Sequence, residues 1–123
     1  HSTPLRVRGL HGRLRPDIVL GDRYGTSCSS ELTDFIASVL SRLGYSVNRN
    51  KPYAGGFITE HYGQPARGLH AMQIEFNRNL YMEERTLVKS ARFARLQADL
   101  ATLMTALIDA FDDGFLRQPE AAE

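Results

Sequence analysis

The stretch DIVLGDRYGTSCSSELTDFIASVLSRLGYSV, residues 17–47, decides the fold, because it predicts a strand, a helix and a second strand in succession. Its first four residues form a short apolar strand that runs into a glycine-rich and serine-rich turn. Ser29 or Ser30 can cap the helix, Gly44 ends it, and residues 45–47 alternate as the next strand. The helix carries apolar side chains at the i, i+3, i+4 spacing of an amphipathic helix: Leu32, Phe35, Ile36, Val39, Leu40 and Leu43.

The segments around this unit predict the rest of the architecture. Residues 3–16 predict an irregular loop, residues 52–63 a loop with one helical turn, and residues 69–76 a third strand. Residues 90–112 predict a second long helix with a buried stripe of Phe93, Leu96, Leu100, Leu103, Met104, Leu107, Ile108 and Phe111. In this stripe we interpret Met104 as core rather than as a ligand. Alternating strands and helices indicate an α/β fold with crossover helices on a mostly parallel sheet.

Composition limits the partners and the setting. The chain has 123 residues, one ordinary domain, and 42% hydrophobic content, enough for a core. A net charge of +1 gives no field that favours nucleic acid or an anionic membrane, and no apolar run of about 18 residues predicts a membrane span. Cys28 is the only cysteine, which excludes an internal disulfide and favours a reducing, cytosolic location. We expect Cys28 to be a small buried side chain.

The segment HAMQIEFNRNLY, residues 70–81, concentrates polar chemistry at the end of a predicted strand. It delivers a carboxylate, an amide and a guanidinium from Glu75, Asn77 and Arg78, and strand ends are where rigid scaffolds place catalytic groups. An edge strand with a solvated polar face would give the same pattern. We expect His70 to hydrogen-bond a backbone group, whereas His61 fits a pocket wall and a surface equally well. The residues alone do not determine a reaction.

Longer blocks of sequence resemble one enzyme family. NKPYAGGFITEHYGQPARGLHAMQIEFNRNLYM (residues 50–82), the loop GDRYGTSCSSEL and the opening HSTP are similar to N-formylglutamate amidohydrolases, the deformylases that close one route of histidine degradation. The similarity spans residues 1–115. It implies a fold like that of the zinc carboxypeptidases, a mixed α/β sheet flanked by helices with one zinc ion. In that family the metal is held by an early histidine and acidic residue and by a later histidine followed by serine.

The resemblance also assigns roles to residues of this chain. His1 and Ser2 match the later histidine segment, so His1 is an implied zinc ligand, and Glu75 matches the catalytic glutamate. The early ligand pair has no counterpart here, and one ligand cannot hold a catalytic zinc, which takes about three protein ligands. The chain also lacks an initiator methionine. We therefore expect residues 1–123 to be the C-terminal part of a single amidohydrolase domain, the rest of which carries the other ligands.

The implied reaction is hydrolysis of N-formyl-L-glutamate to formate and L-glutamate. Zinc would polarise the formyl carbonyl and lower the pKa of its bound water toward neutrality, and Glu75 would move the proton from water to the departing amine. The two substrate carboxylates need cationic partners. Candidate substrate-binding residues are Arg78, Arg23, Arg67 and Tyr62.

Two of these candidates have a competing interpretation. Arg78 reaches the site of Glu75 only if the strand has already ended, since residues i and i+3 of a strand point to opposite faces. Tyr62 could close over the substrate or could simply pack its loop. Two other functions also stay open: a deacylase for another N-acyl amino acid, and a non-catalytic half-domain that binds a partner or has lost zinc. The oligomeric state is not determined by the sequence.

Overall fold

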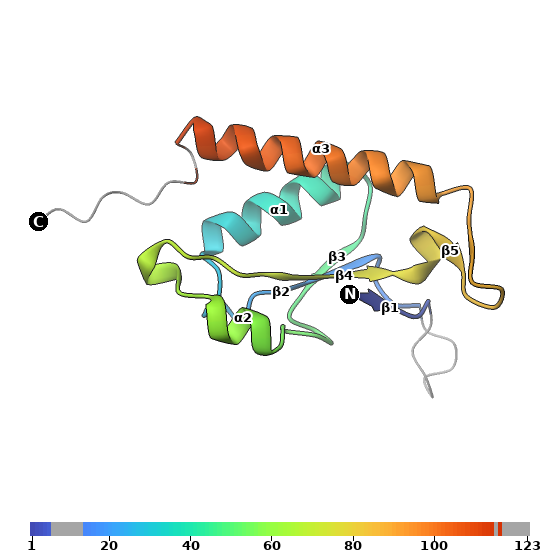
Figure 1. Cartoon of the computed structure of the whole chain (residues 1–123), viewed down its shortest axis with the longest axis horizontal. Coiled ribbons are helices and arrows are strands. Elements are labelled where there is room, and N and C mark those ends of the chain that lie inside the picture. Colours follow the sequence, from blue (N-terminus) through green and yellow to red (C-terminus); the bar gives the residue numbers. More distant parts are fainter. Residues whose placement is uncertain (6–13, 115, 117–123) are drawn as a thin grey trace, which may run out of the picture.

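A computed structural model describes residues 1–5, 14–114 and 116 of the chain (Figure 1). It contains a four-stranded sheet in the order β1-β4-β2-β3, a two-stranded hairpin and three α-helices. None of the helices in the described ranges is long and apolar enough to cross a membrane. The elements are β1 Ser2–Thr3, β2 Ile18–Gly21, α1 Ser30–Arg42, β3 Val47–Arg49, α2 Phe57–Tyr62, the 3₁₀ turn η1 Pro65–Arg67, β4 Gln73–Asn77, the 3₁₀ turn η2 Arg78–Leu80, β5 Met82–Glu83, β6 Val88–Lys89 and α3 Phe93–Asp112.

The strands pair as a mixed, mostly parallel sheet. Strands β2 and β3 are parallel neighbours joined by α1, the expected strand–helix–strand unit. Strand β4 lies between β1 and β2; it runs antiparallel to β2, with Glu75 opposite Val19, and parallel to β1, with Phe76 opposite Ser2. The predicted fold class, an α/β fold with a mixed, mostly parallel sheet flanked by helices, is therefore confirmed.

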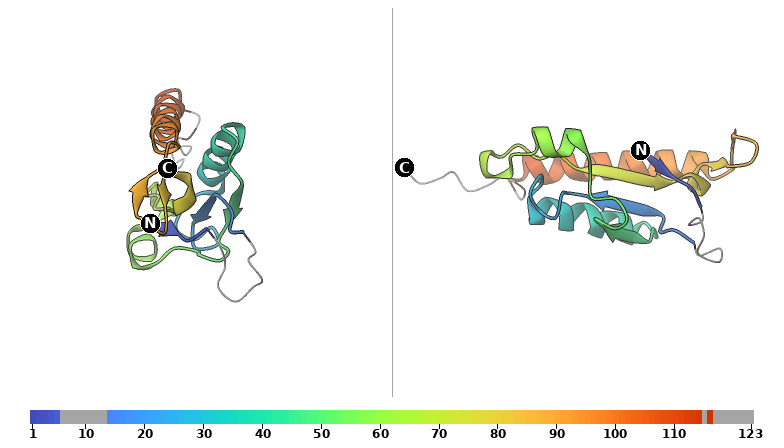
Figure 2. Two further views of the ribbon diagram at one scale, coloured as in Figure 1. Left: turned by 90° about the vertical axis from the view of Figure 1, so that its right-hand side faces the viewer. Right: turned by 90° about the horizontal axis from the view of Figure 1, so that it is seen from below.

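The two faces of the sheet have different surroundings. Helices α1 and α3 cover one face, and α2 lies on the other (Figures 1 and 2). Ile18 and Leu20 of β2 are fully buried in the core with the apolar residues of α1 and α3. Because side chains alternate along a strand, Val19 and its partner Glu75 point to the α2 face. Cys28 is completely buried in the main core, as predicted.

Helix α1 begins and ends as the sequence predicts. Ser29 is the N-cap, and its Oγ accepts a hydrogen bond from the backbone N–H of Leu32 at 3.3 Å. The backbone N–H of Ser29 donates to His70 Nδ1 at 3.1 Å, which confirms the expected bond between His70 and a backbone group. Gly44, at φ +98°, follows the last turn in the left-handed conformation that suits glycine.

Several predicted boundaries differ from the structure. The second strand begins at Val47 rather than at residue 45, and the third begins at Gln73 rather than at residue 69. The latter shift arises because Leu69 pairs with Gln64 around η1 and Ala71 N–H donates to Ser27 C=O at 2.8 Å, so residues 69–72 are not free to join β4. The hairpin β5–β6 was not predicted. In the predicted loop 3–16, Thr3 belongs to β1, while residues 6–13 lie outside the described residues.

The predicted buried stripe of α3 is wrong for three of its residues, whereas Leu107 in the same half of the helix is partly buried against the core. Met104 and Ile108 are each 57% exposed and Phe111 is 39% exposed, whereas Leu96, Leu103 and Ala110 are buried. The buried residues recur every seven positions because α3 touches the rest of the described chain along one narrow side only. Tyr45 adds a polar tie on that side: its hydroxyl donates to Asp99 of α3 at 2.6 Å, and burial together with this acceptor raises its pKa to about 12.

This division of α3 predicts unequal costs for two neighbouring truncations. We expect Leu103→Ala to lower the free energy of unfolding by about 2–5 kcal/mol, because it opens a cavity in the core. The matched Met104→Ala should change it by about 0.5 kcal/mol or less, the usual range for a surface position. Urea unfolding of both variants measures the difference. A cost for Met104→Ala as large as that for Leu103→Ala would contradict an exposed Met104 in the intact protein.

Candidate active site

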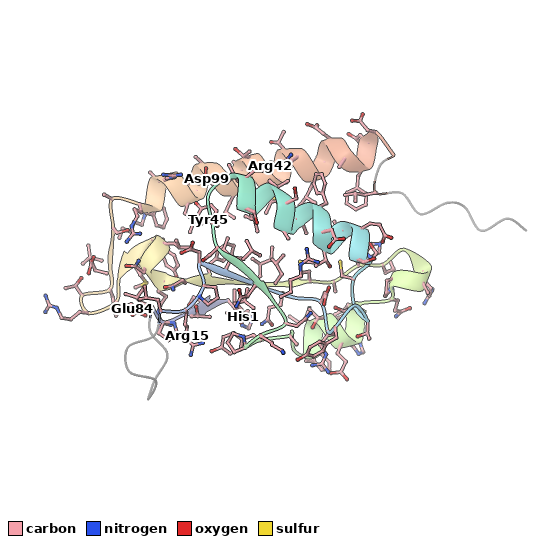
Figure 3. All side chains as sticks on the ribbon, turned by 180° about the vertical axis from the view of Figure 1, so that it is seen from behind. His1, Arg15, Arg42, Tyr45, Glu84 and Asp99 are labelled. Atoms are coloured by element: carbon pink, nitrogen blue, oxygen red, sulfur yellow. The ribbon has the colours of Figure 1, made fainter. Side chains whose placement is uncertain are left out.

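The structure brings together His1 and Glu75. The parallel pairing of β1 with β4 places Ser2 opposite Phe76, so His1 lies beside Glu75, and His1 Nδ1 is 3.3 Å from Glu75 Oε1. The Glu75 side chain is only 7% exposed, whereas that of His1 is 69% exposed. Figure 3 shows His1 on the side of the sheet away from α1 and α3. A buried carboxylate next to an accessible imidazole can exchange a proton with a small molecule that reaches His1 from solvent.

Gln73 fixes the carboxylate of Glu75. Its Nε2 donates a hydrogen bond to Glu75 Oε1 at 2.7 Å, and the two residues are two positions apart on β4, so their side chains share one face. A carboxylate held on a strand by a second side chain keeps its orientation, as a catalytic group requires. The sequence analysis did not select Gln73, although the i, i+2 spacing in Gln73-Ile74-Glu75 was the available signal.

A small cavity adjoins the pair on the α2 side of the sheet. Its volume is about 230 Å³, below the usual range of pockets for drug-sized molecules. Thr59, which was not predicted as a site residue, is buried here, and its hydroxyl donates to Gly56 C=O at 2.8 Å. The cavity shares His1 and Gln73 with the polar pair and is lined by His1, Ile58, Thr59, Met72, Gln73 and Ile74.

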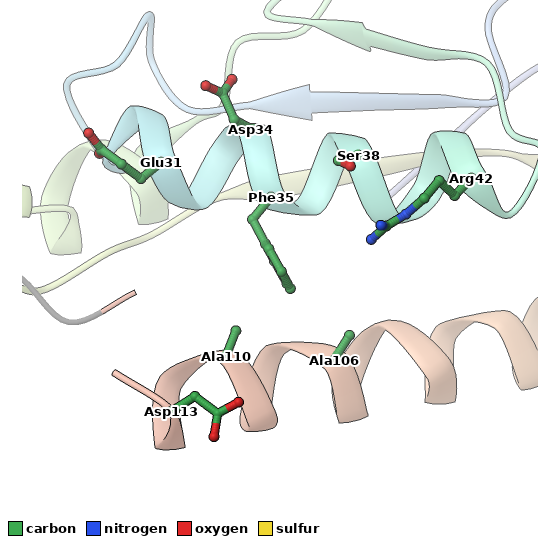
Figure 4. A pocket seen from close by; sticks show the side chains of 8 residues that line it. All are labelled: Glu31, Asp34, Phe35, Ser38, Arg42, Ala106, Ala110 and Asp113. Carbon is green, nitrogen blue, oxygen red and sulfur yellow. The ribbon is translucent and has the colours of Figure 1, made fainter. Parts of the chain in front are cut away.

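A larger groove lies elsewhere. It has a volume of about 910 Å³ and opens between α1 and α3, on the sheet face opposite to Glu75 (Figure 4). Phe35 points from α1 toward α3, whereas Asp34 points away from α3. None of the residues that line this groove belongs to β1 or β4, so the groove is separate from the candidate site. The lining residues are Glu31, Asp34, Phe35, Ser38, Arg42, Ala106, Ala110 and Asp113.

Close backbone packing positions the loop before α2. A Cβ atom on Gly21 of β2 would lie 2.6 Å from Ala54 C and from Gly55 N, so only glycine allows the loop to lie directly on the strand. Asn50, at φ +59°, begins this loop. Its Oδ1 accepts from the backbone N–H groups of Asp22 at 3.1 Å and of Tyr24 at 3.3 Å.

Asp22 is the buried centre of that contact. Its carboxylate accepts hydrogen bonds from Asn50 Nδ2 at 2.8 Å, Gly25 N–H at 3.0 Å and Thr33 Oγ1 at 2.9 Å. Burial raises the pKa of Asp22, but the hydrogen bonds from Asn50, Gly25 and Thr33 outweigh it and leave the pKa below its ordinary value. The ionised carboxylate thus joins α1 to the loop that leads to α2.

The predicted substrate-binding residues all have partners within the chain. Arg78 Nε lies 2.9 Å from Glu84 Oε1, and Arg23 lies 3.4 Å from Glu60. Arg67 donates to Gln64 Oε1 at 2.7 Å. Tyr62 is 60% exposed at the surface, with its ring against His61, which is exposed as well. None of the four predicted residues lines the small cavity, and their role in binding substrate stays a prediction.

The described part of the chain does not complete a zinc site. Among those residues, no group of three or more His, Cys, Asp or Glu side chains could hold a metal ion. His70 Nδ1 is occupied by the Ser29 N–H, and burial raises the pKa of the Cys28 thiol, which disfavours a thiolate ligand. The role of His1 as a metal ligand stays a prediction from the family resemblance, and by itself His1 is fewer than the three protein ligands of a catalytic zinc.

Comparison with known proteins identifies the family. The family model of N-formylglutamate amidohydrolase matches residues 1–82, which include both His1 and Glu75. The chain belongs to the N-formylglutamate amidohydrolase family. An N-formylglutamate deformylase of Pseudomonas aeruginosa is 42% identical over 109 residues, which are 88% of this chain and 39% of that protein. One from Pseudomonas putida is 39% identical over 85 residues, 68% of this chain and 32% of that protein.

Solved structures agree with this assignment. The crystal structure of N-formylglutamate amidohydrolase from Ralstonia eutropha JMP134 matches with a TM-score of 0.84 and 39% identity, covering 93% of this chain and 42% of that one. A gene product of Agrobacterium tumefaciens matches with a TM-score of 0.60 and 22% identity, a likeness of fold alone. The chain therefore spans about two fifths of the length of these two solved structures, as it does of the Pseudomonas aeruginosa deformylase.

The Asp22 contact predicts an acid-dependent stability. Because the folded-state pKa of Asp22 is lowered, its ionised form stabilises the fold above the unfolded pKa of about 3.9, and this contribution is lost as the pH falls through the lower folded value. We expect Asp22→Asn to reduce the free energy of unfolding at pH 7 by about 2 kcal/mol. Urea unfolding at pH 7 and at pH 3 should show the difference from wild type shrinking at the lower pH.

Asp34→Asn is the matched control. Asp34 is an exposed carboxylate of α1 that pairs with Arg49 at the surface, and exposed ion pairs contribute little. This variant should unfold within about 0.5 kcal/mol of wild type at both pH values. Equal effects of Asp22→Asn and Asp34→Asn would contradict a special role of the buried carboxylate.

Proposed function

We propose that the intact protein hydrolyses N-formyl-L-glutamate to formate and L-glutamate. The observation that carries the proposal is the buried Glu75 carboxylate, which is held by Gln73 beside the His1 imidazole, with Gln73 and His1 both lining a small cavity. Family membership supports it, since the Pseudomonas relatives are N-formylglutamate deformylases. In this proposal the chain is an amidohydrolase acting on a linear amide, with Glu75 as its general base.

Glu75 suits a role as base and then acid. Its side chain is almost fully screened from solvent, so a proton that it takes from water can be returned to the amine rather than lost. Both polar contacts of the carboxylate, with Gln73 and with His1, involve Oε1. We infer that Oε2 receives the proton of the attacking water and delivers it to the departing nitrogen of glutamate.

Zinc is part of the proposal through His1. When bound, zinc would supply Lewis-acid polarisation of the formyl carbonyl and activation of water. The accessible imidazole of His1 fits one ligand position, and the remaining ligands would have to come from outside the described residues. The same proposal places the reaction in histidine degradation and, because the sole cysteine is a buried free thiol, in the reducing cytosol.

A second candidate function is a deacylase for a different N-acyl amino acid. The lining of the cavity supports it, because Ile58 of α2 is an apolar lining residue that a formyl group does not require. An acetyl or longer acyl group would bury its carbons against this side chain. The two functions use the same Glu75 and differ only in the acyl group that the cavity accepts.

Formate release tests the proposed reaction. We expect the intact protein to release formate from N-formyl-L-glutamate, to lose this activity after chelation and to regain it when zinc is added back. N-acetyl-L-glutamate, assayed by release of acetate, compares the two acyl groups. Faster turnover of the acetyl substrate would favour the second function, and chelator-resistant release would contradict the role of zinc.

Two substitutions on β4 test the roles of its side chains. Glu75→Gln should lower kcat by about 10²–10⁴-fold, the usual contribution of a general acid–base residue. Gln73→Leu should lower kcat by about tenfold with little change in KM, because the carboxylate loses one orienting hydrogen bond. Gln97→Leu, on the exposed side of α3, is the matched control and should leave kcat unchanged. Wild-type kcat in Glu75→Gln would remove Glu75 from the mechanism.

A further inference from the structure

Arg15 is an arginine with an unsatisfied buried donor. Its guanidinium carbon lies 5.6 Å from the centroid of the Tyr53 ring, a cation–π contact. Among the residues that the structure describes, Arg15 Nε is the one buried side-chain nitrogen or oxygen without a hydrogen-bond partner. A buried polar group without a partner is rare and asks for an explanation, and a bound ligand is one.

The chain around Arg15 lies against the end of β4. Asn77 N–H donates to Asp17 C=O at 2.8 Å, and Asn77 Nδ2 donates to Pro16 C=O at 3.4 Å. Asn77 is two positions beyond Glu75, so the two side chains share the α2 face of the sheet. Arg15 and His1 both lie on the side of the sheet away from α1 and α3 (Figure 3). Arg15 therefore stands on the face that carries Glu75.

The charge of Arg15 is available to a ligand. Arg78 and Arg23 each face a carboxylate, Glu84 and Glu60 respectively. Within the described ranges no ion pair joins Arg15 to a carboxylate; it has the aromatic ring of Tyr53 instead. An aromatic face holds a guanidinium in place and leaves its N–H groups free for the planar, two-point binding of a carboxylate.

We propose that Arg15, supported by Tyr53, binds the side-chain carboxylate of the N-formyl-glutamate substrate, an inference that rests on the proposed function. Distance selects this carboxylate over the other. Val19 lies opposite Glu75, and Arg15 is four residues before Val19, a span of at most about 13 Å along the chain. The Arg15 side chain can cover only part of this distance toward Glu75. It therefore meets the side-chain carboxylate of the substrate, which is farther from the scissile amide than the α-carboxylate is.

The test compares two substrates that differ in one group. For the intact protein, kcat/KM is measured with N-formyl-L-glutamate and with N-formyl-L-glutamine, whose side chain ends in a neutral amide. We expect Arg15→Ala to lower kcat/KM for the glutamate substrate by about 10- to 100-fold and to leave the glutamine substrate nearly unchanged. Arg15→Lys should recover only part of the loss, because an ammonium group lacks the planar fork.

Variants of Tyr53 and a control arginine separate this role from folding. Tyr53→Phe keeps the ring beneath Arg15 and should retain the preference for glutamate, while Tyr53→Ala should weaken it. Arg85→Ala removes an exposed arginine of the β5–β6 turn and should keep the wild-type preference. Thermal unfolding of each variant identifies any that fail to fold. If an alanine variant does not fold, the preference for the glutamate over the glutamine substrate is judged on Arg15→Lys and Tyr53→Phe.

Direct binding separates this inference from the proposed reaction. Isothermal titration of the intact protein with L-glutamate and with L-glutamine reports the carboxylate contact without turnover. Binding of L-glutamate that Arg15→Ala abolishes would support the assignment even if the protein released no formate. The assignment would be overturned by unchanged substrate preference in Arg15→Ala, by equal losses for both substrates, which would indicate the α-carboxylate, or by loss of preference in Arg78→Ala alone.

Discussion

The insertion of β4 between β1 and β2 is the constraint on which the site depends. Residues 1 and 75 are far apart in the sequence, and only the parallel pairing of β1 with β4 places His1 next to Glu75. The antiparallel pairing with β2 on the other side puts Glu75 opposite Val19 and screens it from solvent. Because backbone hydrogen bonds fix both neighbours, the carboxylate does not depend on a flexible loop for its position.

The alternation of side chains along β4 places its core residues on one face of the sheet and its candidate site residues on the other. Ile74 and Phe76 join the apolar core beneath α1 and α3, whereas Gln73, Glu75 and Asn77 face the opposite side. A shift of one residue in the pairing would place the carboxylate in the core and the apolar side chains at the site. In that shifted register Glu75 would be buried against α1 and α3 without a partner, which would cost free energy. This cost disfavours the shifted register and so favours the pairing that the site needs.

The sequence was most informative where local and tertiary preferences agree. Helix α1 could be predicted with its cap at Ser29 or Ser30 and its end at Gly44, because the capping residues, the apolar spacing and the glycine all indicate the same boundaries. Helix α3 could be located, but three of the eight residues in its predicted apolar stripe are exposed, since the spacing of apolar residues does not reveal how many neighbouring elements cover the helix. The pairing of β1 with β4 is non-local, so the sequence did not predict the contact between His1 and Glu75, and the family resemblance only assigned both residues to one site. Gln73 was passed over because an amide on a strand carries no motif of its own.

The network around Asp22 connects these two parts of the molecule. Its carboxylate binds Thr33 of α1, which packs on the core side, and Asn50, which begins the loop on the α2 side. That loop carries Tyr53 and then α2, whose Thr59 lines the cavity. The absence of a side chain on Gly21 lets the loop rest directly on β2. The Asp22 carboxylate thus connects the main core to the loop that carries Tyr53 and to the cavity wall at Thr59. A substitution that breaks its hydrogen bonds should therefore increase the mobility of the site before it unfolds the sheet.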